Sequence, residues 1–270
     1  MTRVLGTPIE VAHDDDRTRT LLVSDLHVPE GESQVLRDFA ELLAQARHDP
    51  HHTRVLILGD LLEVYVGSRQ LGHGTVRHVV ELLGAATRAG VSITVLHGNR
   101  DFLLDPPFAR ATGCRVVPGG LHFCLQGRRV LALHGDELCW RDLPYQRSKR
   151  LLRHPITQAL TRALPLALSL WLAGGIRARS MASVQSGDPG RFDPVAPALE
   201  AAFASGAEVL VFGHIHRPAR GEFRPGAAYL ILPAFDAGGV HAEAEGGRLR
   251  YRDLAGRTVP DFPPRAFPPA

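Results

Sequence analysis

Short apolar runs rich in β-branched residues recur along the chain, and nearly all of them end in polar residues. Six runs predict strands: TLLVSD (20–25), RVLILGD (54–60), SITVLHGN (92–99), RVLALHGD (129–136), EVLVFGH (208–214) and AYLILPA (228–234). Between the first three, apolar residues at helical spacing predict helices over 35–48 and 75–90. This alternation predicts an α/β fold made of βαβ units with a largely parallel sheet.

The polar residues that end the first five runs are types that bind metal ions. In parallel sheets, functional groups gather beyond the carboxyl ends of the strands, so we expect these side chains to share one rim. The candidate ligands are Asp25, His27, Asp60, Asn99, His134, His214 and His216. Oxygen and imidazole donors suit Mn, Fe or Zn. Seven donors are too many for one tetrahedral ion and indicate two divalent ions, for which Asp60 is the natural bridge.

The charge of such a site indicates its substrate class. Two divalent ions held by only two carboxylates, Asp25 and Asp60, leave a net positive charge that favours a phosphate. Glycines at 59, 98, 135 and 213 lie within two residues of a candidate ligand, where strands turn sharply or the backbone approaches the ions.

Composition limits the size of the core, the class of partner and the compartment that we expect. The chain has 270 residues, of which 44% are hydrophobic, enough for one large core. Its net charge is only +3 and Lys149 is the single lysine, so nucleic-acid binding is not expected. Three cysteines without CxxC spacing favour a reducing compartment. The N-terminal residues have no signal-peptide pattern, and the longest apolar stretch, 164–175, is too short to span a bilayer. We therefore expect a cytoplasmic protein.

The order of the motifs carries a family resemblance. DxH (25–27), GD (59–60), GNRD (98–101), HGD (134–136) and GHxH (213–216) together resemble the calcineurin-like metallophosphoesterase superfamily. The resemblance implies a two-layer β-sandwich flanked by helices. It also implies one metal on Asp25, His27, Asp60 and His216 and a second on Asp60, Asn99, His134 and His214. Mn²⁺ is the expected ion, with Fe or Zn as alternatives.

Longer strings resemble the UDP-2,3-diacylglucosamine hydrolases within that superfamily. They are GDLLEVYVG (59–67), HGNRDFLL (97–104) and HGDELCWRDLPYQ (134–146). The resemblance implies cleavage of the pyrophosphate of UDP-2,3-diacylglucosamine into UMP and 2,3-diacylglucosamine 1-phosphate, a step of lipid A synthesis. It implies catalytic roles for Asn99, Arg100 and His134. The substrate would contact Asn99, Arg100, Asp142, Tyr145, Arg177, Arg179, Ser180 and His214.

The segment from about 140 to 197 is expected to form a helical cap inserted into one domain spanning 1–255. Residues 150–182 combine many leucines with arginines, which suits acyl chains, anionic head groups and the inner face of the cytoplasmic membrane. A helical hairpin that merely packs on the core is the alternative. The Pro-rich tail, 256–270, is expected to be extended or disordered.

The chain also departs from the lipid hydrolases. These enzymes usually carry lysines after the segment corresponding to 177–180, whereas this chain continues with Met181 and has none there. Arginines at 177, 179 or 191 are the possible replacements, although Arg does not copy Lys. A related phosphodiesterase or pyrophosphatase acting on another lipid or nucleotide is therefore a second hypothesis. A non-catalytic scaffold is a third, which the complete set of seven ligands disfavours.

Overall fold

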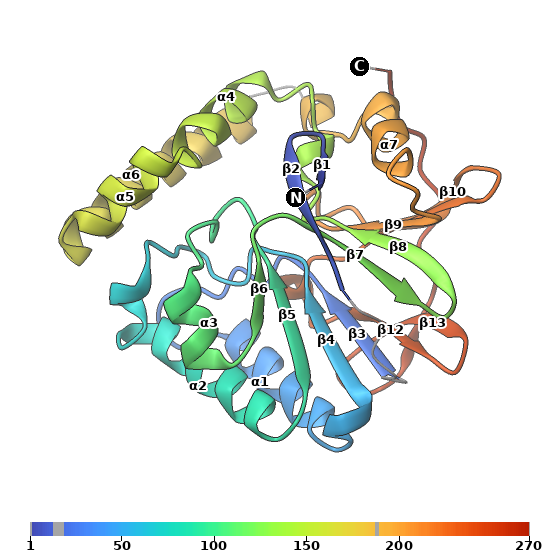
Figure 1. The fold of residues 1–270 in the computed structure, drawn as a ribbon, viewed down its shortest axis with the longest axis horizontal. Helices are drawn as coiled ribbons and strands as arrows, with labels where there is room; N and C mark the ends of the chain where they lie inside the picture. Colours follow the sequence, from blue (N-terminus) through green and yellow to red (C-terminus); the bar gives the residue numbers. More distant parts are fainter. Residues whose placement is uncertain (1, 13–18, 187–188, 270) are drawn as a thin grey trace.

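Two seven-stranded sheets pack face to face and carry helices on their outer faces (Figure 1). The computed structural model describes residues 2–12, 19–186 and 189–269, without the side chains of Thr2 and of 179–186 and 189. The first sheet has the order β14-β13-β12-β3-β4-β5-β6. Its strands are β3 (Arg19–Val23), β4 (Thr53–Ile57), β5 (Ser92–Leu96), β6 (Arg115–Val117), β12 (His241–Glu245), β13 (Arg248–Arg252) and β14 (Thr258–Val259).

The second sheet has the order β1-β2-β7-β8-β9-β11-β10. Its strands are β1 (Thr2–Val4), β2 (Thr7–Val11), β7 (Gly120–Leu125), β8 (Arg128–Ala132), β9 (Val209–Phe212), β10 (Ala219–Arg224) and β11 (Ala227–Ile231). The expected two-layer α/β fold is confirmed. The single, largely parallel sheet was wrong: β3 to β6, β8-β9-β11 and the pair β2-β7 are parallel, and the remaining neighbours in the two sheets are antiparallel.

Alternating side chains of the central strands build three apolar layers. Leu21 packs toward the helices α1 (Gln34–Ala46), α2 (Gly74–Arg88) and α3 (Pro106–Thr112), whereas its neighbour Leu22 packs between the sheets. On the other side, α7 (Ala196–Phe203) covers the second sheet. The central strands are buried on both faces, which is why they read as continuous apolar runs. The two helices predicted from spacing begin within one residue of their expected starts.

Three further helices form an arm that projects from the body near the upper rim (Figure 1). This helical arm consists of α4 (Leu143–Leu152), α5 (Pro155–Ala163) and α6 (Leu166–Ser186). Nine of the ten large hydrophobic side chains that are exposed in the described chain lie on it. They are Leu143, Leu151, Ile156, Leu160, Leu168, Leu170, Trp171, Leu172 and Ile176. The apolar face of the arm therefore does not pack on the core of the described protein.

The Pro-rich tail runs extended along the body. Its short strand β14 pairs with β13, and Phe262 packs edge-on against Tyr251 with ring centres 4.8 Å apart. Near the end, Phe267 packs against Tyr229 at 4.9 Å. Of the two alternatives left open for this segment, the structure has the extended one.

Candidate metal centre

The carboxyl ends of both parallel blocks meet at one rim, and the candidate ligands follow them. Asp25 and His27 follow β3, Asp60 follows β4 and Asn99 follows β5. From the second sheet, His134 follows β8, while His214 and His216 follow β9. Hydrogen bonds join the two sets across the sandwich. The Nδ1 of His134 lies 2.8 Å from the Leu58 carbonyl oxygen, and the His214 amide donates to Asp25 Oδ2 at 2.7 Å.

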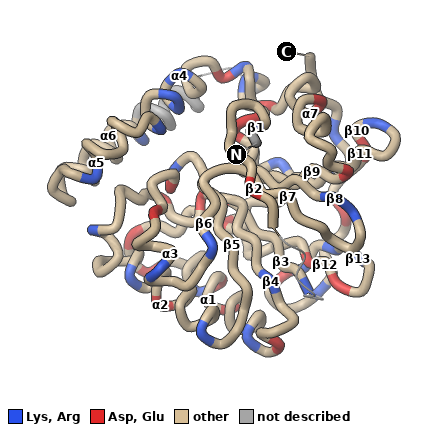
Figure 2. Tube along the Cα trace, viewed as in Figure 1, with Lys and Arg blue, Asp and Glu red and all other residues tan. Residues whose placement is uncertain are grey.

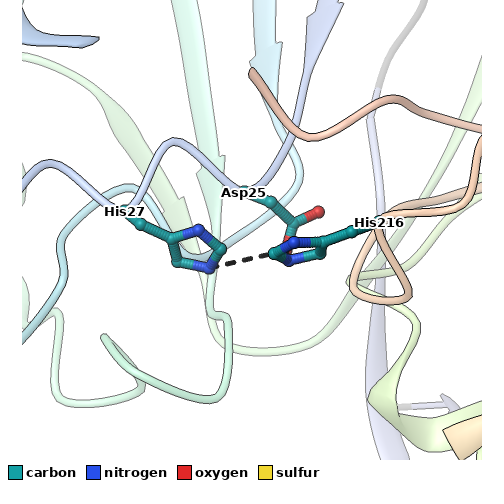
Figure 3. Close-up of side chains that lie close together, drawn as sticks. All are labelled: Asp25, His27 and His216. Carbon is teal, nitrogen blue, oxygen red and sulfur yellow. Dashed lines mark ion pairs between the residues drawn. The ribbon is translucent and has the colours of Figure 1, made fainter. Parts of the chain in front are cut away.

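The side chains form two overlapping clusters. Asp25, His27 and His216 point toward one another (Figure 3), and their ligand atoms lie within 4.8 Å. Asp25, Asp60 and His134 form the second cluster, within the same distance. Asp60 faces both, because its Oδ2 lies 3.1 Å from His27 Nε2 and its Oδ1 lies 3.7 Å from His134 Nε2.

The two remaining candidate ligands border the second cluster. The side-chain oxygen of Asn99 lies 2.8 Å from His134 Nε2, and His214 Nδ1 lies 3.2 Å from the same atom. All seven candidate ligands are thus brought to one rim. That each of them binds metal remains a prediction.

Two features of this rim fit a bound cation. Asp25 Oδ1 is buried and has no hydrogen-bond partner among the described residues, although it lies 3.4 Å from His216 Nε2. An unpaired buried carboxylate oxygen is costly unless a cation compensates it. The second feature is strained backbone at the ligands. Seven described non-glycine residues have a positive φ, and five of them are candidate ligands. They are Asp25, His27, Asp60, His214 and His216, and such strain concentrates at functional sites.

Close backbone packing explains two of the motif glycines. A Cβ on Gly98 would lie 2.1 Å from Asp60 Oδ1, and one on Gly213 would lie 2.4 Å from Asp25 Oδ2. These glycines therefore let neighbouring strand ends approach the carboxylates, rather than leaving room for the ions directly.

The carboxylates and imidazoles of the rim shift the pKa values of one another. Burial would raise the pKa of Asp25, but the nearby imidazoles of His216, His134 and His27 lower it overall. Burial would lower the pKa of His27, but its bonds to Asp236 and Asp60 raise it to about 9. The rim therefore holds ionised carboxylates beside imidazoles that keep their protons, and a metal ion would have to displace those protons.

The pKa values of His134, in the second cluster, and of His214 beside it are shifted in opposite directions. Burial tends to lower the pKa of His134, but Asp60 and Asp25 raise it overall. For His214, burial and the neighbouring His134 lower the pKa to about 4. His214 is therefore neutral at pH 7 and is ready to act as a ligand.

Sequence reasoning missed Asp236. It lies in the short 3₁₀ segment η5 (Phe235–Ala237) after β11, and its Oδ2 lies 2.8 Å from His27 Nδ1. A carboxylate on one ring nitrogen fixes the orientation of the imidazole and directs the other nitrogen to a metal. The strand-end pattern could have identified it, since Asp236 follows the sixth predicted strand.

A buried ionic network connects the HGD motif to the helical arm. Lys149 Nζ lies 2.7 Å from Asp136 Oδ2 and 3.5 Å from Glu137 Oε1. The Tyr145 hydroxyl donates to Asp136, and Arg153 Nη2 lies 3.9 Å away from the same carboxylate. Burial would raise the pKa of Asp136, but Lys149 and Arg153 hold it well below its usual range. The only lysine of the chain thus fixes α4 to the rim.

The predicted substrate residues are only partly gathered at the rim. Arg100 is close to it, with Nε 3.3 Å from Asp60 Oδ2. Tyr145 lies near His214, with ring centres 6.3 Å apart, whereas Asp142 caps α4 by accepting a bond from the Tyr145 amide at 3.4 Å. Arg177 reaches the loop after β4, where it pairs with Glu63. The side chains of Arg179 and Ser180 lie outside the described part of the chain.

Comparison with known proteins identifies the family. Residues 18–218 match the model of the calcineurin-like phosphoesterases. The chain belongs to this family. Similar proteins include the UDP-2,3-diacylglucosamine hydrolase of Cellvibrio japonicus, 38% identical over 74% of this chain and 83% of the relative. The protein of that name from Ralstonia nicotianae is 35% identical over 92% of this chain and 93% of the relative. The one from Pseudomonas savastanoi is 33% identical over 88% of this chain and 98% of the relative.

Proposed function

We propose that this calcineurin-like phosphoesterase hydrolyses the pyrophosphate of UDP-2,3-diacylglucosamine, giving UMP and 2,3-diacylglucosamine 1-phosphate. The observation that carries the proposal is the position of the metal-ligand rim beside an arm with an exposed apolar face. Hydrolysis of a lipid nucleotide requires both, since one part holds phosphates and the other accepts acyl chains. The relatives named for this reaction match most of the chain.

The metal ligands in this proposal are the seven rim residues. Asp25, His27, Asp60 and His216 would hold one divalent ion, and Asp60, Asn99, His134 and His214 the other, with Mn²⁺ as the favoured ion. When bound, the two ions supply Lewis acidity to water and to the phosphate oxygens. His216 has a side chain that is 40% exposed, so water reaches the rim there.

Arg100 supplies the main contribution of the protein to charge stabilisation. Its guanidinium lies beside Asp60 and is only partly exposed, so it can donate two bonds to a phosphate next to the metal ligands. Charge that develops on the phosphate oxygens is stabilised by such a fixed donor. Asn99, which lies beside His134, and Tyr145, which lies near His214, would orient the substrate.

The test of this reaction is UMP release from UDP-2,3-diacylglucosamine with added Mn²⁺. A chelated sample and the Asp60→Ala variant serve as controls. Metal-dependent release that disappears in both controls would support the proposal. No release, in a sample that binds two metals and cleaves a generic phosphodiester, would refute the lipid substrate and favour the related activity on another lipid or nucleotide. The absence of lysine from residues 177–187 is the observation that keeps this second activity open.

The helical arm is proposed to bind the membrane that contains the lipid. Residues 143–187 hold seven basic residues and no acidic residue. Basic positions lie along the described arm (Figure 2), which also carries nine exposed apolar side chains. Apolar side chains bordered by cations suit an interface of anionic lipids. Within the described residues, no helix is long and apolar enough to cross a bilayer.

Vesicle sedimentation would test this surface. We expect wild-type protein to bind vesicles with anionic lipid more strongly than purely zwitterionic ones, and the double variant Leu151→Ser, Trp171→Ser to lose most of that binding. Val11→Ser is the matched control, because Val11 is 69% exposed but lies outside the arm. Equal binding by all three proteins would show that the arm is not the membrane-binding surface.

A further inference from the structure

Glu63 joins two arginines that come from separate parts of the chain. It lies in the loop after β4, three residues beyond Asp60. One of its carboxylate oxygens accepts from Arg100, in the loop after β5, and the other accepts from Arg177 on α6. Arg177 also approaches the Glu63 carbonyl oxygen, at 3.5 Å. Both oxygens of one carboxylate are thus used to hold the core loop and the arm together.

Such a carboxylate has the same chemistry as a phosphate edge. A guanidinium grips two oxygens of either group through parallel N–H bonds. Arg100 lies beside the metal-ligand rim, so Glu63 and a phosphate bound at the rim would compete for the same guanidinium. The three side chains are only 23% to 29% exposed, which limits the screening of their charges by water.

We propose that Glu63 is an internal substitute for a phosphate: it holds Arg100 and Arg177 in position when the site is empty, and a phosphate-bearing ligand displaces it. This inference rests on the proposed function, in which Arg100 faces the substrate, and on the substrate contact that the family resemblance implies for Arg177. Glu63 is then a positioning residue that weakens anion binding. A diphosphate with two anionic groups competes with it better than a single phosphate does. After cleavage, Glu63 recaptures the arginines and favours release of the product.

The size of the effect follows from the exposure of the ion pairs. A partly exposed pair contributes up to about fivefold to an equilibrium constant. Displacing two such pairs should therefore weaken phosphate binding by roughly fivefold to tenfold. If Glu63 merely oriented the arginines, its replacement would change phosphate affinity in the opposite direction and weaken binding.

The experiment measures binding of inorganic phosphate to the metal-loaded protein by calorimetry. We expect Glu63→Gln to tighten binding by roughly fivefold to tenfold, and part of this gain to vanish in an Arg177→Gln background, where only the pair with Arg100 is left to displace. Glu243→Gln is the matched control, since Glu243 also holds two arginines, Arg19 at 2.7 Å and Arg252 at 2.9 Å, but lies on β12 away from the rim. It should leave phosphate affinity unchanged.

The possible outcomes separate this inference from the proposed reaction. Unchanged or weaker phosphate binding by Glu63→Gln would overturn the inference. An equal gain in the Arg177→Gln background would show that Glu63 does not withhold Arg177 from phosphate. Glu63→Ala removes the same carboxylate and should show the same direction if the Gln variant does not fold. The assay involves no lipid turnover, so failure to hydrolyse UDP-2,3-diacylglucosamine would leave this result intact, and the reverse also holds.

Discussion

His27 is held between two carboxylates, with its Nδ1 2.8 Å from Asp236 Oδ2 and its Nε2 3.1 Å from Asp60 Oδ2. Asp236 belongs to the segment after β11, so the second sheet orients a ligand that the first sheet supplies. This arrangement fixes which ring nitrogen faces the rim.

Replacing Asp236 should weaken metal binding without unfolding the protein. We expect Asp236→Ala to lower Mn²⁺ affinity by about 10- to 100-fold, the usual effect of removing a carboxylate that orients a metal-bound histidine. Calorimetric titration measures the affinity. Asp49→Ala is a matched control, because Asp49 also pairs with a histidine, His52 at 2.9 Å, but on the exposed surface. Equal affinity of the Asp236 variant and wild type would refute this role.

Metal binding should release protons and become tighter as the pH rises. The raised pKa of His27, about 9, means that the metal-free protein holds a proton there throughout the neutral range. A ligating imidazole must be neutral, so the ion that His27 binds displaces that proton, and the affinity for this ion increases from pH 6 to pH 9 by up to about tenfold per unit for each proton released. Titrations in buffers of different ionisation enthalpy count the protons. A flat profile without proton release would contradict the prediction.

The strand-end rule explains why the rim could be predicted from sequence. A buried strand such as SITVL that continues into Asn99 has few reasons for polar groups except function, and five strands repeat the pattern. The partition into two sheets was not readable from the residues, because β8 and β9 look like the strands of one parallel sheet. The second layer is revealed only by the pairing of β8 with β7 and by the apolar layer between the sheets, which Leu22 shares with Val130 and Val211.

Long-range ionic contacts were beyond sequence reasoning for a different reason. Glu63 lies in an irregular segment after Asp60, since α2 begins only at Gly74. Its partner Arg177 is 114 residues away, and no periodicity connects them. Lys149 and Asp136 meet in the same way, through the fold alone.

Asp60→Ala should abolish both metal occupancy and turnover, since Asp60 faces ligands of both clusters. Asp60→Asn keeps the shape and one oxygen ligand but loses the charge, so we expect it to retain part of the metal. Elemental analysis of the purified variants gives the stoichiometry. Two metals per chain in Asp60→Ala would exclude a bridging role.

Arg100→Ala should keep the metals and lose turnover by about 100-fold or more, the scale for removal of one charge-stabilising donor. Arg100→Lys should recover little, because an ammonium cannot form the two parallel bonds of a guanidinium. Steady-state kinetics and metal analysis together test this. Arg115→Ala is the control, because Arg115 is also paired, with Glu10 at 3.0 Å, but lies on β6. Normal turnover in Arg100→Ala would remove it from the catalytic set.

Gly98→Ala should disturb the rim through its backbone. The added Cβ would lie 2.1 Å from Asp60 Oδ1 and 2.2 Å from the Asp60 amide nitrogen, neither of which can move without displacing a candidate ligand. We expect a loss of about 1–3 kcal/mol in the free energy of unfolding, together with weaker Mn²⁺ binding. Gly174→Ala, in α6, has no atom within 4 Å of its new Cβ and should instead gain about 0.5–1 kcal/mol from helix propensity. Denaturant unfolding of the two variants measures both changes, and a Gly98 variant as stable and as metal-bound as wild type would show that the strand ends at Asp60 and Gly98 can separate without cost.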